Sequence, residues 1–302
     1  MAVVNRRYAE VGPSNVRLQT VVHSSAVVTR RYPQAVCDIA IDDAAPGILD
    51  TLDEFMARHG YVYVPSLPES GNPRGYVRGF VPVWTSVSRV TVSAGDGRSA
   101  DNTTDIMLAA PAVVDITLAG TGGLDTGLEA ANTWYYVHVV ADSTGVNPTA
   151  GLLSTSATAP TLPSGYDQFR RIGTVRNTAG SNFRPFAVSG INAERSVQYT
   201  DALSGRQVLA AGAATAVTLI ACNALIPPTT RLGCFQYAQR GNVDANLYDD
   251  PANAIATMQR ILIGGSVAAD RMRVSATREI GYANTAAGGL VDVWVTGYEE
   301  AI

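Results

Sequence analysis

The sequence contains no lysine, so arginine provides all of its permanently charged basic side chains. Charged residues make up only 16% of the 302 residues, and the formal net charge is -4. A chain without a basic excess has no electrostatic reason to bind nucleic acid or an anionic membrane surface. We therefore expect no nucleic-acid partner. The exclusive use of arginine indicates a GC-rich genome or a need for arginine in buried and interfacial ion pairs.

Cysteine is also scarce, and the three that occur are Cys37, Cys222 and Cys234. Their number is odd, their spacing is wide, and none belongs to a CxxC pair, which argues against a disulfide framework and against a zinc site. Cys222 and Cys234 lie in apolar runs, where a free cysteine packs as a small hydrophobic residue. We expect neither a metal nor a cofactor.

Long apolar runs are missing too, because no stretch approaches the roughly 20 residues that a membrane-spanning helix needs. The first seven residues lack the apolar core of a signal peptide. We therefore expect no membrane insertion, and synthesis and assembly in a cytoplasm.

Turn-forming residues are abundant, with 28 glycines and 15 prolines spread along a chain that is 46% hydrophobic. Short apolar segments between turns are typical of β-strands. The length is sufficient for two or three domains with their own cores. The sequence thus predicts a mainly β protein.

The first 65 residues are the only region in which a helix is predicted. Apolar residues follow an amphipathic period over Ala45–His59, after Pro46 and before Gly60. With strands predicted at 35–41 and 61–65, this region forms a small α/β module. It has no glycine-rich phosphate loop and its acidic residues lack the spacing of a calcium loop, so we interpret residues 1–65 as a docking module.

Residues 66–79 contain two prolines and several glycines, which predicts an irregular linker. The middle domain, 80–190, has predicted strands at 87–93, 104–108, 113–118, 133–141, 169–176 and 183–188. Its predicted turns lie at 94–98, 120–123, 143–148 and 178–182. The C-terminal domain, 198–302, has predicted strands at 207–210, 216–223, 230–237, 259–264, 271–277 and 290–298. Each domain is expected to be an antiparallel, jelly-roll-like β-sandwich.

Several motifs of the middle domain, in this order and spacing, resemble a recurring module of bacteriophage tail fibres and virion proteins. They are Leu124-Asp-Thr-Gly127, Asn132-Thr-Trp-Tyr-Tyr-Val137, Gly151-Leu-Leu-Ser-Thr-Ser156, Pro160-Thr-Leu-Pro-Ser-Gly-Tyr166 and Arg170-Arg-Ile-Gly-Thr-Val175. The resemblance covers roughly residues 86–186. It implies a β-rich domain of fibres, spikes and head-attached appendages, and it carries no catalytic or ligand residue. The closing strand, 291–298, resembles the C-terminal domains of some phage fibres.

This resemblance implies a structural component of a phage virion, assembled in the host bacterial cytoplasm. We expect a tail-fibre or spike subunit that is a homotrimer and that attaches through its N-terminal module to other virion proteins of the tail or capsid. One alternative is a capsid decoration or head-fibre protein. A second alternative is a carbohydrate-binding or carbohydrate-cleaving module.

A receptor-binding role needs exposed aromatic residues with polar neighbours, and one loop-like stretch provides them. The candidate receptor-contact residues are Tyr237, Arg240, Asn242, Asn246 and Tyr248. They could bind a host surface glycan, or the stretch could be an ordinary solvated loop shaped by asparagine and aspartate.

No catalytic residue is predicted, because the sequence has no GxSxG, HExxH or P-loop motif. The adjacent acids Glu299 and Glu300 should point to opposite faces of a strand, which makes them poor partners for one substrate. His138 lies on a strand with no second histidine or cysteine nearby, which favours a hydrogen-bonded or solvent-edge histidine over a ligand.

Overall fold

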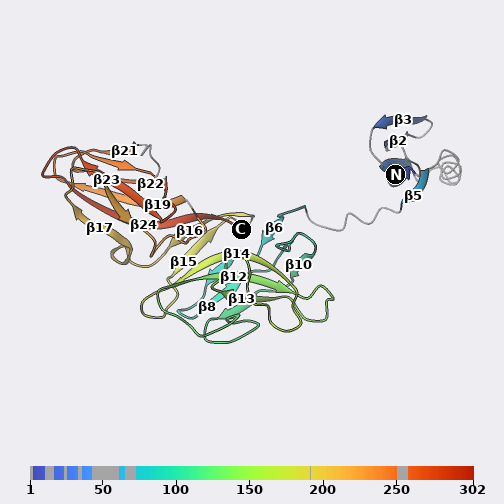
Figure 1. The fold of residues 1–302 in the computed structure, drawn as a ribbon, viewed down its shortest axis with the longest axis horizontal. Helices are drawn as coiled ribbons and strands as arrows, with labels where there is room; N and C mark the ends of the chain where they lie inside the picture. The colour runs from blue at the N-terminus through green and yellow to red at the C-terminus, as the bar shows by residue number, and fades with distance from the viewer. Residues whose placement is uncertain are drawn as a thin grey trace. The chain divides into compact units, whose positions relative to one another are not determined.

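The computed structural model describes residues 3–10, 17–23, 26–32, 36–42, 61–64, 73–190, 192–230, 232–249 and 258–302. The chain divides into two compact units, Met1–Gly71 and Asn72–Ile302 (Figure 1). In the described parts of the chain, strands predominate, and the one helix is the short 3-10 helix η1 (Leu203–Arg206). No helix among these residues is long and apolar enough to cross a membrane. The mainly β class is therefore confirmed.

The first unit contains one five-stranded sheet with the order β3–β2–β4–β1–β5. Its strands are β1 (Val3–Glu10), β2 (Arg17–His23), β3 (Ala26–Tyr32), β4 (Val36–Asp42) and β5 (Tyr61–Val64). All pairings are antiparallel except that of β2 with β4. Strands β4 and β5 match the two strands predicted here, whereas the predicted helix Ala45–His59 lies outside the described residues.

Residues 73–185 of the second unit form three small antiparallel sheets, which we call the middle lobe. The sheet orders are β10–β9–β6, β11–β8–β7 and β13–β12–β14. The strands are β6 (Val77–Gly79), β7 (Pro82–Trp84), β8 (Arg89–Val92), β9 (Gly95–Arg98), β10 (Asp105–Leu108), β11 (Ala112–Asp115), β12 (Thr133–Ala141), β13 (Ala150–Ser154) and β14 (Gln168–Asn177). The predicted linker 66–79 thus ends in a strand.

Strand β12 is the centre of the middle lobe and has the predicted bounds Thr133–Ala141. Every residue from Tyr135 to Ala141 is buried, so both faces of this strand are covered. Part of the cover comes from β11, whose Val114 lies so close to Gly151 of β13 that a Cβ on this glycine would be 2.3 Å from Val114 Cγ2. A strand buried on both faces has a continuous apolar run instead of a strict alternation.

The predicted turn at 94–98 is wrong, because Gly95–Arg98 is strand β9, between β6 and β10. The two glycines in this segment indicate close approach of neighbouring backbones instead of a turn. A Cβ at Gly95 would lie 2.4 Å from the main-chain nitrogen of Phe80, and one at Gly97 would lie 3.0 Å from the main-chain oxygen of Tyr76.

Residues 186–302 form two larger antiparallel sheets, which we call the C-terminal lobe. The larger sheet has the order β15–β16–β24–β19–β22 with β17 also paired to β24, and the smaller has the order β18–β23–β20–β21. The strands are β15 (Phe186–Ser189), β16 (Glu194–Tyr199), β17 (Gln207–Gly212), β18 (Thr218–Ala221), β19 (Leu232–Arg240), β20 (Ala245–Tyr248), β21 (Met258–Leu262), β22 (Val267–Arg273), β23 (Glu279–Asn284) and β24 (Leu290–Ala301).

The inner faces of these two sheets belong to one buried cluster. Phe235 and Val293 represent the larger sheet in this core, and Leu247 and Ile280 represent the smaller one. The sheets are also joined by a polar contact, in which Gln239 Nε2 of β19 donates to the side-chain oxygen of Asn284 on β23, at 2.8 Å.

Strand β15 belongs to the C-terminal lobe, although the sequence placed it in the middle domain. Phe186 of β15 lies opposite Tyr199 of β16, so residue 190 falls within a hairpin of the larger sheet. Strands β16, β20 and β23 are absent from the sequence prediction. They are rich in polar and small residues, whose low β-propensity conceals them until cross-strand pairing is known.

We predict that Gly95→Ala destabilises the protein by about 1 to 3 kcal/mol, because the added methyl group would overlap main-chain atoms on β6 and just after it. Urea unfolding of the variant and the wild type measures this loss. Gly205→Ala in η1 is the matched control, because its Cβ would meet nothing closer than 3.5 Å. Equal midpoints for the two variants would contradict the packing argument.

Candidate functional site

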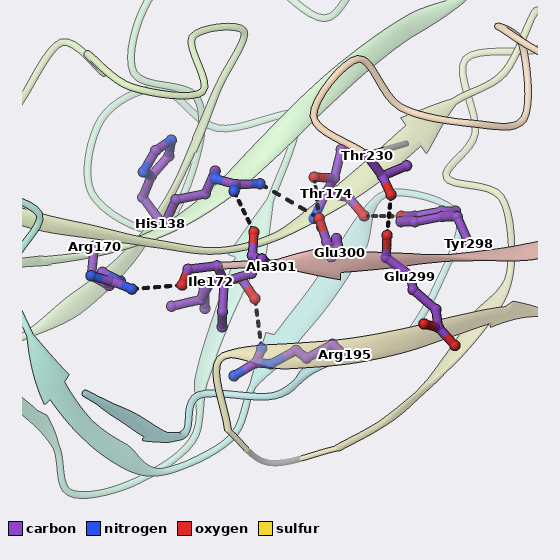
Figure 2. A network of polar contacts seen from close by, with 12 residues as sticks. His138, Arg170, Ile172, Thr174, Arg195, Thr230, Tyr298, Glu299, Glu300 and Ala301 are labelled. Carbon is purple, nitrogen blue, oxygen red and sulfur yellow. Dashed lines mark hydrogen bonds and ion pairs between the residues drawn. The ribbon is translucent and has the colours of Figure 1, made fainter. Parts of the chain in front are cut away.

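The end of β24 lies against the middle lobe, where two consecutive arginines of β14 bind it; Figure 2 shows the first of them, Arg170, with Ala301 and Glu300. Arg171 Nη2 donates to the main-chain oxygen of Ala301 at 2.6 Å, and Arg170 Nη2 donates to that of Ile302 at 2.6 Å. The arginine pair of the motif Arg170-Arg-Ile-Gly-Thr-Val175 therefore binds the end of the C-terminal lobe. We call this contact region, with Thr174, Arg195 and Glu300, the lobe junction.

Glu300 of β24 is a buried carboxylate within the lobe junction, with 4% of its surface exposed. It accepts hydrogen bonds from the main-chain nitrogen of Thr174 at 3.2 Å and from the Thr174 hydroxyl at 2.7 Å, and its Oε2 lies 3.5 Å from Arg171 Nη1 (Figure 2). Burial raises the pKa of Glu300, and the Thr174 hydroxyl and the charge of Arg171 oppose that rise. Both carboxylate oxygens are thus engaged in structural contacts.

Arg195 of β16 is the second buried charge of the lobe junction, with 2% exposure. Its guanidinium donates to the main-chain oxygens of Gly79 at 2.6 Å, Phe80 at 2.8 Å and Ile172 at 2.6 Å. A fourth, longer bond joins Nε to the oxygen of Asn192 at 3.3 Å. Burial lowers the pKa of Arg195 to about 10, and the nearby charge of Glu300 partly offsets this effect. Arg195 thus connects β16 to β6 and β14.

Aromatic side chains extend the lobe junction along β24. Tyr298 is 1% exposed, and its hydroxyl donates to the main-chain oxygen of Thr174 at 2.8 Å. Trp134 of β12 packs edge-to-face on Tyr298 with ring centroids 6.1 Å apart, and its indole N–H donates to the oxygen of Asn223 at 3.0 Å. The guanidinium of Arg176 lies 5.4 Å from the centre of the Trp134 ring. These ring contacts and hydrogen bonds add buried apolar area and further polar contacts between the middle and C-terminal lobes.

His138 of β12 is fully buried beside this region. Its Nε2 lies 3.0 Å from the main-chain oxygen of Ser156, so that nitrogen is the donor, and its ring packs edge-to-face on Phe169. Burial lowers the pKa of His138 to about 4. No group of three or more metal-binding side chains occurs among the described residues. His138 therefore lies in the core as a neutral, hydrogen-bonded histidine.

Of the candidate receptor-contact residues, Tyr237 is placed differently from the prediction. It is 0% exposed, stacks on Phe235 with centroids 5.8 Å apart, and its hydroxyl lies 2.7 Å from the sulfur of Met272. Strand β19 points its odd-numbered residues from 233 to 239 into the core. The prediction of an exposed Tyr237 is thus wrong, because strand alternation turns this ring inward.

The other four candidates do not form one surface. Arg240, at the end of β19, is exposed and forms a bidentate ion pair with Asp292, which is 2% exposed. Asn242 is exposed in the turn that follows. Asn246 and Tyr248 alternate with buried residues on β20 and share the outer face of the smaller sheet, so the predicted loop is partly a strand. The structure brings together only these last two residues.

An open cleft of about 500 Å³ lies on the outer face of the larger sheet. Its walls include Ser189, Glu194, Ser196, Arg271 and Glu299. These residues come from β15, β16, β22 and β24, and the cross-strand register places Ser189 beside Ser196 and Ser196 beside Glu299. Sequence reasoning missed this cleft because no motif links segments so far apart in the chain. Comparison with protein-family models and with curated proteins gave no match.

We predict that Arg195→Met destabilises the protein by about 3 to 5 kcal/mol, because three short hydrogen bonds to main-chain carbonyl groups, two of them buried, are lost. Chemical unfolding followed by tryptophan fluorescence measures the change. Arg78→Met, on the exposed side of β6, is the matched control and should change stability by less than about 0.5 kcal/mol. A loss below 1 kcal/mol for Arg195→Met would argue against a stabilising role of the lobe junction.

We predict that His138 makes the protein less stable in acid. The unfolded chain binds a proton at His138 below about pH 6.5, whereas the folded protein does so only near pH 4. The contribution is complete above pH 6.5 and is lost as the pH falls towards 4, which amounts to about 3 kcal/mol. Unfolding measured at pH 7 and pH 4 should therefore show a smaller stability change for His138→Gln than for the wild type. An equal or larger change in the variant would refute this assignment.

Proposed function

We propose that this chain is a structural, non-enzymatic subunit of a bacteriophage virion, a tail fibre or spike, that displays β-sandwich domains for host attachment. The observation that carries the proposal is the arrangement of the segments that resemble a phage module. Three of them coincide with β12, β13 and β14, which form one sheet. In that sheet Tyr136 lies opposite Ser154, and Tyr135 lies opposite Val175. The motif residues therefore act as one structural unit.

The roles of those motif residues support a structural function. Arg170 and Arg171 bind the end of β24, and Trp134 packs on Tyr298. Their hydrogen bonds and ring contact hold two lobes together. A firm connection between lobes suits an appendage that must keep its shape under mechanical load. The resemblance carries no catalytic residue, and the side chains of Arg170 and Arg171 are occupied by contacts between the lobes.

The adjacent acids Glu299 and Glu300 are not arranged as a catalytic pair. Glu300 is buried and bonded to Thr174, whereas the side chain of Glu299 is 28% exposed and pairs with Arg271 at 2.7 Å. The two adjacent carboxylates thus serve opposite faces of β24. Acid–base cleavage of a glycan needs two carboxyl groups on either side of one bond, about 5 to 9.5 Å apart, with at least one of them free to exchange a proton. Two carboxylates on opposite faces of one strand do not flank a common bond.

In this proposal residues 1–65 attach the subunit to tail or capsid proteins. The middle and C-terminal lobes then serve as the jelly-roll-like sandwiches of a homotrimer. The five-stranded sheet of the first unit is the part that would dock. The second unit, which is compact by itself, would project towards the host.

We predict that the purified chain has three times its 31.7 kDa mass in light scattering and that it blocks adsorption of the encoding phage to its host cells.

Immunogold labelling of purified virions with an antibody against the chain should mark the tail or its fibres. Label on the head without an effect on adsorption would instead identify a capsid decoration or head-fibre protein. Virions without label would refute a role in the particle.

A further inference from the structure

The cleft on the larger sheet has the dimensions of a small-ligand site. Its volume of about 500 Å³ lies within the range of roughly 300 to 1,000 Å³ that is typical of such sites. Four strands and the start of β19 contribute to it, so its polar groups converge from separate segments. Leu232 of β19, opposite Glu299 in the sheet, adds an apolar wall.

The cleft is built on a fixed base. Arg195 of β16 and Glu300 of β24 also line the cleft, but their charged groups are engaged in the lobe junction, where Arg195 donates to the main-chain oxygen of Ile172 and Glu300 accepts from Thr174. Gly190 in the β15–β16 turn has a φ of +93°, and a Cβ there would lie 2.6 Å from the main-chain oxygen of Glu194. This close turn holds Glu194 at the rim. Polar groups placed on rigid strands lose little conformational entropy when they bind a ligand.

The chemistry of the cleft favours a neutral ligand. Glu194 and Glu299 provide carboxylate acceptors, and Arg271, which is 2.7 Å from Glu299, provides guanidinium donors. Arg271 and Glu299 neutralise each other as an ion pair, and Glu194 adds a further carboxylate, so the cleft disfavours an anion. Ser189 and Ser196 add hydroxyl groups that both donate and accept. A ligand with many hydroxyl groups can satisfy all of these partners without a net charge.

We propose that this cleft binds a neutral saccharide, with Arg271 and Glu299 as its main hydrogen-bonding contacts and Leu232 against the C–H face of a sugar ring. Adjacent hydroxyl groups of a sugar fit a guanidinium–carboxylate pair, because one hydroxyl accepts from the arginine while the next donates to the carboxylate. The proposal rests on the proposed function, since it names the class of host-surface molecule that the virion protein recognises. It moves the recognition site from the predicted stretch 237–248 to the outer face of β16, β22 and β24.

The test applies the full chain to an array of neutral hexose, deoxyhexose and N-acetylhexosamine oligosaccharides, with uronic-acid and sulfated oligosaccharides as charged comparisons. We expect binding to at least one neutral oligosaccharide, confirmed by titration calorimetry. Arg271→Ala and Glu299→Gln should each weaken that binding roughly tenfold or more, because each removes a charge-assisted hydrogen bond. Arg78→Ala, which makes the same change at an exposed position of β6 outside the cleft lining, should leave the affinity within about twofold.

Melting curves of all variants establish that they are folded. Three results would overturn the proposal: no binding of any neutral oligosaccharide at millimolar concentration, preferential binding of the charged comparisons, or affinity unchanged by both cleft variants. If virions are labelled and adsorption is blocked while the array is negative, the cleft assignment fails and the virion role stands. If the array is positive and virions carry no label, the virion role fails and the cleft assignment stands.

Discussion

Burial of the Arg195 guanidinium is the constraint on which the arrangement of the second unit depends. Removing a charge from water costs several kcal/mol unless hydrogen bonds replace its hydration. Here that replacement comes from carbonyl groups of Gly79, Phe80 and Ile172, which belong to segments about 90 residues apart. Because the compensation exists only when these segments and β16 are all in place, the middle and C-terminal lobes are held in one relative position within this unit. Glu300, bonded to Thr174, adds a buried charge of the opposite sign.

Strand alternation links this buried network to the outer surface. The charged groups of Arg195 and Glu300 form hydrogen bonds in the lobe junction, whereas their neighbours Ser196 and Glu299 lie opposite each other on the other face of the same strands. Residues next to each other on a strand lie on opposite faces, so the same two strands provide both the anchor and the binding surface. A one-residue shift of β24 against β16 would turn Glu299 into the junction and Glu300 out towards the cleft, while Arg195 and Ser196 kept their faces. The buried charges therefore fix the register that forms the cleft.

The sequence predicts the β class and many strands, because apolar alternation and turn residues are local signals. The bounds of β12 are predicted correctly, since its aromatic and β-branched run is continuous from Thr133 to Ala141. Strand β9 is missed because the glycines that let β6 approach also look like a turn. Tyr237 is wrongly placed on the surface because a single residue of register decides which way a ring points. The cleft depends on pairing between distant strands, which local patterns do not contain.

The hydrogen bonds of the lobe junction require arginine, and lysine could not replace it there. Arg195 donates from three nitrogen atoms to carbonyl groups in different directions, and Arg171 reaches both Glu300 and the oxygen of Ala301. A planar guanidinium has five N–H donors in a fixed geometry, whereas an ammonium group presents three donors from one atom and is more strongly hydrated. Lysine at position 195 would leave carbonyl groups without a partner and would cost more to bury. A GC-rich genome can explain why arginine is common in this chain, but the geometry of these bonds explains why it is needed here.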